Sequence, residues 1–222
     1  GKLSILVDDL NAVALTDGAT GIGHTRWATH GAPTDCNAHP HLSRDNKLAL
    51  IHNGIIENFV ELKEELLAEG YTFESETDTE VVAKLVGREY DRGDGLAAAL
   101  GRVVVRLEGA FTVLALHSDE PGVVVGARRN SPLVIGLGEG ENFLGSDVAA
   151  FVEHTKRAVA VGQDQIVTIT PSSVTVTDFL GTEVEGHEYE VLWDASASEK
   201  GGWSSFMAKE ISEQPDAVAN TL

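Results

Sequence analysis

Three short polar segments carry the residue types that could do chemistry. They are residues 23–31 (GHTRWATHG), 52–58 (HNGIIEN) and 75–80 (SETDTE). The second and third segments each stand where one predicted element ends and another begins. From such positions a fold can direct several polar groups into one cleft. We therefore interpret the three segments as parts of a single pocket for a free amino acid with a side-chain amide, such as glutamine.

Two charged residues suit the two ends of an amino acid. The planar guanidinium of Arg26 can hold an α-carboxylate through paired hydrogen bonds. Asp78 can hold the α-ammonium group, because Thr77 is the predicted cap of a helix and leaves the Asp78 carboxylate free at the first helical position. Each residue taken alone has an ordinary alternative: Arg26 forms a surface or interdomain salt bridge, and Asp78 only complements the helix dipole.

The side-chain amide of Asn53 and the backbone N–H of Gly54 are predicted to form an oxyanion hole, since two adjacent donors can converge on one developing negative oxygen. The alternative is that Asn-Gly forms a hairpin turn, although a capped helix rather than a second strand follows it. Thr29 and His30 are candidates for further hydrogen bonds to the ligand, and Trp27 for a wall of the pocket. The pocket contains no evident nucleophile.

A histidine-rich stretch raises the question of zinc. Four histidines (24, 30, 39 and 41) and Cys36 lie close together in sequence. Their spacing fits no strong zinc signature, and His39-Pro40-His41 is more typical of a hydrogen-bonded corner. We predict no metal and no cofactor.

Composition narrows the function classes. The formal net charge of −19 repels phosphate backbones and anionic membrane surfaces, so no nucleic-acid or membrane partner is expected. The single cysteine cannot form an internal disulfide, and no apolar run is long enough to span a membrane. The default expectation is a cytoplasmic protein.

Apolar spacing predicts an α+β fold. Residues 2–15 have a helical spacing with weak ends, and residues 22–27 resemble a strand. Residues 47–52 read as a buried strand closed by Asn53-Gly54. Helices are expected from a cap at Asn58 to Gly70, from a capping box at Thr77 and Glu80 onward, and over 96–107. Strands are expected at 111–117, 123–127, 133–137, 143–144, 158–161, 165–170 and 174–176, with a short helix at 148–154. Such closely spaced strands favour antiparallel sheets.

The C-terminal residues read as a connection. Residues 195–205 are small, polar and glycine-bearing, and residues 206–222 begin helically before Pro215 interrupts them. We therefore predict a domain over 1–194, and over 195–222 a linker and lead into a further domain.

The order of the motifs resembles one family. Residues 23–31, then NAHPH at 37–41, then 52–58, 75–80, 145–147 and 207–215 resemble the glutaminase domain of the glutamine:fructose-6-phosphate amidotransferases, or glucosamine-6-phosphate synthases. The resemblance covers nearly the whole chain. It implies a class II glutamine amidotransferase with an N-terminal-nucleophile hydrolase fold, a four-layer αββα sandwich of two antiparallel sheets.

The resemblance also implies roles and partners. Arg26, Thr29, His30 and Asp78 would hold glutamine, Asn53 and Gly54 would form the oxyanion hole, and Trp27 would lie near the route to a second domain. Ammonia from glutamine would pass to a sugar isomerase domain of the same protein, which makes glucosamine 6-phosphate from fructose 6-phosphate. A homo-oligomer is expected for the intact protein.

The sequence departs from the family pattern at its start. Family members open with a cysteine whose thiolate attacks the glutamine amide, with its own α-amino group as base, followed by several dozen residues that precede the match to Gly1. Neither Gly1 nor Cys36 supplies such a thiolate. We therefore expect the 222 residues to be an N-terminally truncated domain without glutaminase activity, with an unpaired strand edge and a gap in the core. The alternative is a non-catalytic module that binds glutamine or a partner.

Overall fold

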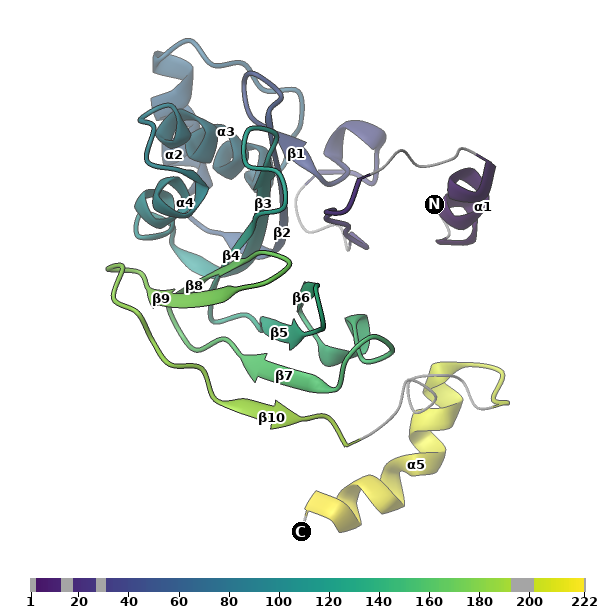
Figure 1. Ribbon diagram of the computed structural model, residues 1–222. Helices are drawn as coiled ribbons and strands as arrows, with labels where there is room; N and C mark the ends of the chain where they lie inside the picture. Colours follow the sequence, from purple (N-terminus) through teal and green to yellow (C-terminus); the bar gives the residue numbers. More distant parts are fainter. Residues whose placement is uncertain (1–2, 13–17, 27–30, 193–201, 222) are drawn as a thin grey trace.

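The computed structural model describes residues 3–12, 18–26, 31–192 and 202–221. A six-stranded antiparallel sheet forms the centre, in the order β1-β2-β3-β4-β8-β9 (Figure 1). The long strands β2 and β3 pair over their whole length, from Leu48 opposite His117 to Ile56 opposite Gly109. The strands of this sheet are β1 (His41–Leu42), β2 (Leu48–Ile56), β3 (Gly109–His117), β4 (Val124–Arg129), β8 (Gln165–Ile169) and β9 (Val174–Asp178).

A second antiparallel sheet packs against one face of the first. Its order is β10-β7-β5-β6, and its strands are β5 (Val134–Leu137), β6 (Asn142–Gly145), β7 (Arg157–Ala160) and β10 (Glu188–Glu190). Ile135 and Val159 from this sheet form one buried cluster with Val124, Val167 and Ile169 from the first. Apolar side chains on facing strands thus hold the two sheets together.

Three helices cover the other face of the six-stranded sheet. They are α2 (Phe59–Ala68), α3 (Asp78–Tyr90) and α4 (Leu96–Val104) (Figure 1). Their apolar faces form the largest buried cluster with β2, β3 and β4, including Leu85, Leu100 and Phe111, all fully buried. Burial of such side chains contributes roughly 1.5–3 kcal/mol each. The predicted helices and the antiparallel α+β arrangement are confirmed.

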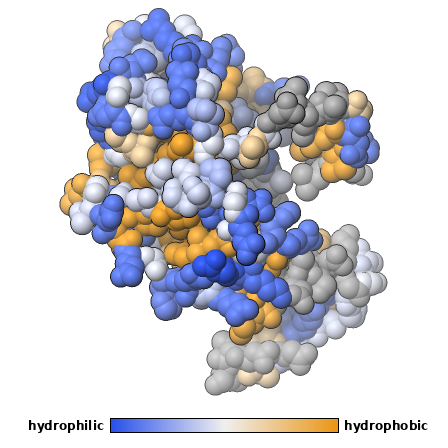
Figure 2. Space-filling model, in the orientation of Figure 1, coloured by the Kyte–Doolittle hydropathy of each residue, from blue (hydrophilic) through white to orange (hydrophobic). Residues whose placement is uncertain are grey.

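The remaining helical elements are short or stand at the chain ends. They are α1 (Leu3–Ala12), η1 (Asp35–Asn37), η2 (Val148–Ala150) and α5 (Phe206–Thr221). On α1 the apolar side chains Ile5, Leu6, Val7 and Leu10 are exposed, and they form a hydrophobic patch at the right of Figure 2. No helix among the described residues is long and apolar enough to cross a membrane.

All seven strands predicted after residue 110 are present, with ends within two residues of those predicted. Two strands were not predicted. β1 and β10 have two and three residues, which is too short to show an alternating pattern. The expected helix at 148–154 is confirmed only as the 3₁₀ turn η2.

Three sequence predictions are wrong in detail. Residues 22–26 form no strand, because the apolar Ile22 packs against the cluster between the sheets instead. Asn53-Gly54 does not close its strand, since β2 continues to Ile56. Pro215 does not interrupt α5, which runs through it to Thr221; the neighbouring surface is exposed, so water can satisfy the carbonyl that proline leaves without a donor. The predicted boundary at 194/195 lies outside the described residues.

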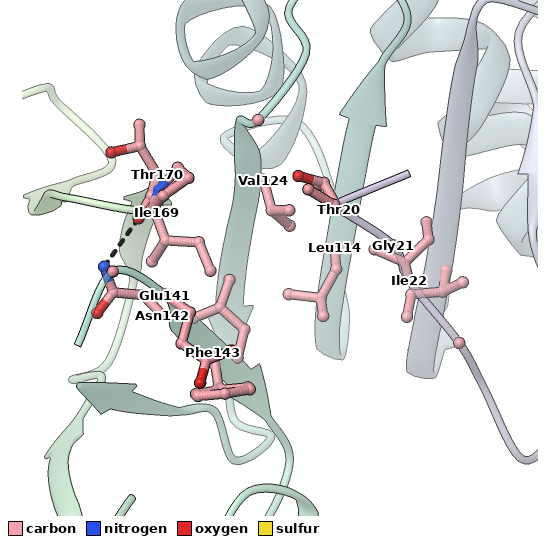
Figure 3. A pocket seen from close by; sticks show the side chains of 17 residues that line it. Thr20, Gly21, Ile22, Leu114, Val124, Glu141, Asn142, Phe143, Ile169 and Thr170 are labelled. Atoms are coloured by element: carbon pink, nitrogen blue, oxygen red, sulfur yellow. Dashed lines mark hydrogen bonds between the residues drawn. The ribbon is translucent and has the colours of Figure 1, made fainter. Parts of the chain in front are cut away.

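A cavity of about 470 Å³ lies between the two sheets (Figure 3). Leu114 and Val124 line it from the six-stranded sheet, Phe143 from β6 of the second sheet, and Ile22 from the irregular segment 18–26. Asn142 bridges the sheets by donating from Nδ2 to the carbonyl oxygen of Thr170 over 2.8 Å. Apolar side chains of the cluster between the two sheets thus form part of the cavity wall.

Candidate active site

Asn53 and Gly54 lie inside β2, opposite Thr112 and Phe111 of β3, so the hairpin alternative is excluded. Gly54 has a φ of 128°. A Cβ atom there would stand 2.1 Å from the carbonyl oxygen of Ala110. Only glycine can adopt this conformation at such close approach. The local chain therefore fixes the backbone next to the exposed Asn53.

Asp78 is the first residue of α3, as predicted, and Thr77 is its N-cap, whose hydroxyl accepts from the Glu80 N–H over 3.3 Å. The prediction that the Asp78 carboxylate is free was wrong. Its Oδ2 accepts from the backbone N–H of Ile56 over 2.9 Å, and the residue is only 3% exposed. This hydrogen bond ties the start of α3 to the end of β2.

The predicted capping box at Thr77 and Glu80 is one-sided. The Glu80 carboxylate does not turn back to Thr77 but accepts from the N–H groups of Glu74 and Ser75, over 3.0 and 2.7 Å. It also accepts from the Ser75 hydroxyl over 2.7 Å and pairs with Lys84 over 3.2 Å. These bonds hold the pKa of Glu80 below its usual value even though burial opposes them. Glu80 thus orders the loop before α3.

Arg26 reaches the same region from the irregular segment 18–26. Its guanidinium donates to the carbonyl oxygens of Gly31 and Ala32, each over 3.1 Å. The buried Asn37 links this loop to the segment before α3, since its Nδ2 donates to the Ala32 carbonyl oxygen over 3.0 Å and its Oδ1 accepts from the N–H of Glu76 over 2.9 Å. The first and third polar segments are therefore joined through Asn37.

A group of imidazole rings lies against the start of α3. The rings of His24 and His39 stack with centroids 4.4 Å apart, and His39 meets His41 edge to face at 5.2 Å. The Nε2 of His41 is 2.9 Å from the Thr77 hydroxyl. The predicted hydrogen-bonded corner at His39-Pro40-His41 is confirmed. Among the described residues, no group of three or more His, Cys, Asp and Glu is arranged to hold a metal ion.

Burial keeps these imidazoles neutral. It is the main cause that lowers the pKa of His39 to about 3, and the neighbouring His24, His41, His52 and Arg26 lower it further. Burial also lowers the pKa of His24 and of His41. A charged imidazolium would lose its hydration here and stand beside other positive groups.

These segments surround one cavity of about 370 Å³. Four of the predicted site residues line it together: Arg26, Asn53, Gly54 and Asp78. The other predicted site residues, Trp27, Thr29 and His30, lie outside the described part of the chain. The rest of the lining comes from His24, Thr25, His39, His52, Ile55, Thr77 and Thr79.

Sequence reasoning missed the part that His39, His52 and Thr79 play in the lining. His39 was considered as a metal ligand and as part of a hydrogen-bonded corner, but not as a lining residue. Thr79 and His52 were present in the polar segments but were not singled out. For Thr79 and His52 a signal was available in the sequence, because Thr79 directly follows Asp78 and His52 directly precedes Asn53. Immediate neighbours of a pocket residue often contact the same pocket.

Comparisons with known proteins identify the family of this domain. A protein-family model described as "Glutamine amidotransferase domain" matches residues 8–184. Curated relatives named glutamine–fructose-6-phosphate aminotransferase [isomerizing] are 73% identical in Leifsonia xyli subsp. xyli, 59% in Streptomyces coelicolor and 56% in Corynebacterium glutamicum. In each case the match covers 100% of this chain and 36% of the relative. The chain thus spans about a third of the length of these relatives.

Solved structures show the same fold. Glutamine phosphoribosylpyrophosphate amidotransferase from B. subtilis, complexed with ADP and GMP, is 28% identical with a TM-score of 0.58 over 70% of this chain and 34% of its own. A structure titled as the allosteric regulatory enzyme of purine biosynthesis matches with the same coverage and identity and a TM-score of 0.59. The predicted fold class, α+β with two antiparallel sheets as in the N-terminal-nucleophile amidotransferases, is confirmed. The chain belongs to the glutamine amidotransferase domain family.

Proposed function

We propose that the cavity binds L-glutamine and is the glutaminase site of an aminotransferase that makes glucosamine 6-phosphate from fructose 6-phosphate and glutamine. One observation carries the proposal: Arg26, Asn53, Gly54 and Asp78, which come from three separate segments, line a single cavity. The relatives that match the whole chain are named glutamine–fructose-6-phosphate aminotransferase [isomerizing], and this supports the choice of reaction.

Each group has a distinct task in this proposal. The Arg26 guanidinium binds the α-carboxylate of glutamine. The Asp78 carboxylate, already anchored by the Ile56 N–H, binds the α-ammonium group with its remaining lone pairs. The Asn53 amide and the Gly54 N–H face the side-chain carbonyl and stabilise the oxyanion that forms when the amide is attacked. The predicted contacts of Trp27, Thr29 and His30 complete the pocket.

The attacking group is not among these lining residues. Within the 222 residues the only cysteine is Cys36, which is exposed in η1, and an internal residue has no free α-amine to serve as its base. We propose that a cysteine thiolate outside these residues attacks the amide. A polypeptide limited to the 222 residues then binds glutamine without releasing ammonia.

The inter-sheet cavity supports a location for that nucleophile. A further hollow, lined by Leu114 and Leu144 and by His52 and Asn53, shares residues with the inter-sheet cavity on one side and with the candidate site on the other. An extended segment seated along these hollows would end beside Asn53. The thiolate at its end would then face the oxyanion donors.

Partners follow from the same proposal. Ammonia released at this site is used by a sugar isomerase domain of the same protein, and the named relatives are about three times the length of this chain. We also propose that the intact protein is a homo-oligomer. We further propose a cytoplasmic location, because the single cysteine cannot form an internal disulfide of the kind found in oxidising compartments.

Calorimetry with glutamine tests the binding site. We expect the heat of binding to disappear, or the affinity to fall about tenfold or more, in Arg26→Ala. Arg44→Ala is the matched control, because it removes the same charge from a side chain that stacks on Tyr71 away from the cavity. Binding that survives Arg26→Ala would remove Arg26 from the pocket.

An ammonia-release assay separates catalysis from binding. The 222-residue polypeptide is expected to release no ammonia from glutamine while still binding it. Clear activity that Cys36→Ala abolishes would overturn the assignment of the nucleophile. Absence of both binding and activity in the intact protein would favour a module that binds a different partner.

A further inference from the structure

The hydroxyl of Thr79 is the common hydrogen-bond partner of three side chains in the candidate site. Its Oγ1 is 3.1 Å from Nε2 of His39, 3.0 Å from Nδ1 of His52 and 3.4 Å from Oδ1 of Asp78. Thr79 itself is 1% exposed, so bulk water does not compete for these bonds. His39 from the loop before β1 and His52 from β2 therefore contact the same oxygen. This oxygen lies directly beside Asp78, the residue assigned to the ammonium group.

The hydrogen-bond capacity of a hydroxyl fixes the protons in this network. A hydroxyl donates one hydrogen and accepts through two lone pairs, whereas a carboxylate only accepts. Because the Thr79 hydroxyl donates to Oδ1 of Asp78, its two lone pairs accept from the imidazoles. It follows that His39 carries its proton on Nε2 and His52 carries its proton on Nδ1. The two rings thus donate to the same hydroxyl from opposite ring nitrogens.

We infer that Thr79 is a positioning residue for glutamine, which orients the Asp78 carboxylate and sets the tautomers of His39 and His52. This inference rests on the proposed glutamine site and adds to it a residue that need not touch the ligand. The Asp78 carboxylate is held on both sides, by the Ile56 N–H at Oδ2 and by Thr79 at Oδ1. A carboxylate that is fixed before binding loses less conformational freedom when it captures the ammonium group.

The tautomer of His39 also determines whether its other ring nitrogen, Nδ1, is a donor or an acceptor. Nδ1 of His39 is buried and has no hydrogen-bond partner among the described residues. In the tautomer set by Thr79 this nitrogen carries a lone pair and can only accept. The His39 ring therefore adds no N–H donor at this nitrogen, and such a donor would repel the ammonium end of the ligand.

Nitrogen NMR of the intact protein with ¹⁵N-labelled histidine tests the tautomers without any substitution. Ring nitrogens with and without a proton have well-separated shifts, so the method reports which nitrogen carries the proton. We expect His39 as the Nε2–H form and His52 as the Nδ1–H form near neutral pH. The opposite tautomer at either ring, or an equal mixture of both forms, would overturn the assignment.

Variants of Thr79 then test positioning. Thr79→Val keeps the shape but removes the hydroxyl, and we expect glutamine affinity to fall about tenfold and both imidazoles to become mixtures of tautomers. Thr79→Ser restores the hydroxyl and is expected to restore the affinity and the tautomers. Thr155→Val is the control for a threonine outside this network and away from the site, because its hydroxyl donates to the Leu137 carbonyl oxygen in the second sheet over 2.6 Å.

The outcomes distinguish a failure of the positioning role from a failure of the proposed function. Wild-type affinity in Thr79→Val, or the same loss of affinity in Thr79→Ser, would overturn the positioning role. If the wild-type protein does not bind glutamine, the proposed function fails and the positioning role fails with it, while the tautomer spectrum still reports on the network by itself. If Thr79→Val does not fold, the positioning role is tested by the wild-type tautomer spectrum and by the glutamine affinity of Thr79→Ser.

Discussion

The two walls of the cavity differ in how they are built. One, which we call the fixed wall, is the end of β2 and the start of α3, where Asp78, Thr79 and Glu80 are at most 4% exposed and hydrogen-bonded to their neighbours. The other, the loop wall, consists of residues 23–26 and 31–32, which form no regular element and of which none is buried. His39 joins the two walls, because its ring stacks on His24 and its Nε2 is 3.1 Å from the Thr79 hydroxyl.

This difference separates stability from binding. The side chains of the fixed wall belong to the hydrogen-bonded core, so removing one must destabilise the domain as well as the site. The guanidinium of the loop wall donates to the carbonyl oxygens of Gly31 and Ala32 in its own wall. The loop wall can therefore contribute to ligand affinity with little effect on folding. Substitutions in the fixed wall should therefore lower the free energy of unfolding more than substitutions in the loop wall.

Gly54→Ala is expected to have the largest effect. The added Cβ meets the Ala110 carbonyl oxygen at 2.1 Å, and φ is 128°. Strain and displaced backbone together should lower the free energy of unfolding by about 3 kcal/mol or more, measured by urea denaturation. Gly70→Ala is the matched control, because its φ is also positive, at 83°, but nothing lies within 4 Å of the new Cβ. We expect about 1 kcal/mol there. Equal losses in the two variants would contradict the clash.

The fixed wall was only partly predictable from sequence. Thr77 as the N-cap and Asp78 at the first helical position follow from local pattern, since capping depends on neighbours in the chain. The bond from Ile56 to Asp78 joins residues 22 positions apart, and no local pattern indicates it. For the same reason the Asn-Gly pair was open to a hairpin interpretation, because only the pairing of β2 with β3 shows that it lies inside a strand.

Asp78→Ala should have the next largest effect. It leaves the buried N–H of Ile56 without its acceptor and removes a negative charge from the N-terminus of α3. We expect a loss of about 2 kcal/mol in the free energy of unfolding, together with loss of glutamine binding. Asp91→Ala, at the exposed C-terminal end of the same helix, should change stability by less than about 0.5 kcal/mol. A stable Asp78→Ala variant would show that the fixed wall does not depend on this carboxylate.

Acid should weaken the junction between the walls. The pKa of His39 is about 3 in the folded protein, below its ordinary value of 6.5, so the unfolded chain takes up a proton first as the pH falls. The stability that neutral His39 contributes is then fully present above pH 6.5 and is lost progressively toward pH 3. The slope is at most about 1.4 kcal/mol per pH unit.

The interval from pH 6.5 to 4.5 is the informative one, because the carboxylates with lowered pKa, such as Glu80, contribute only below it. Denaturation midpoints should fall over this interval in the wild-type protein and fall less steeply in His39→Gln. Parallel curves for the two proteins would mean that His39 is not held neutral by burial.

The loop wall itself was predicted as a motif but not as a structure. The polar sequence of residues 23–31 identified Arg26, yet its apolar residues suggested a strand that is absent from 22–26. The position of this segment depends on side chains that are distant in sequence. Asn37 links it to Glu76, and His24 stacks on His39. Tertiary contacts of this kind override local strand propensity.

Arg26→Ala should have the smallest effect on folding and a large effect on binding. Arg26 lies in a partly exposed loop and donates to the carbonyl oxygens of Gly31 and Ala32, so the free energy of unfolding should fall by about 1 kcal/mol or less. Measured beside Asp78→Ala, this variant decides the comparison of the walls, because both variants should lose glutamine while only Asp78→Ala loses substantial stability. If Arg26→Ala destabilised the protein as much as Asp78→Ala does, the loop wall would be part of the core, and its cation would serve the fold before the ligand.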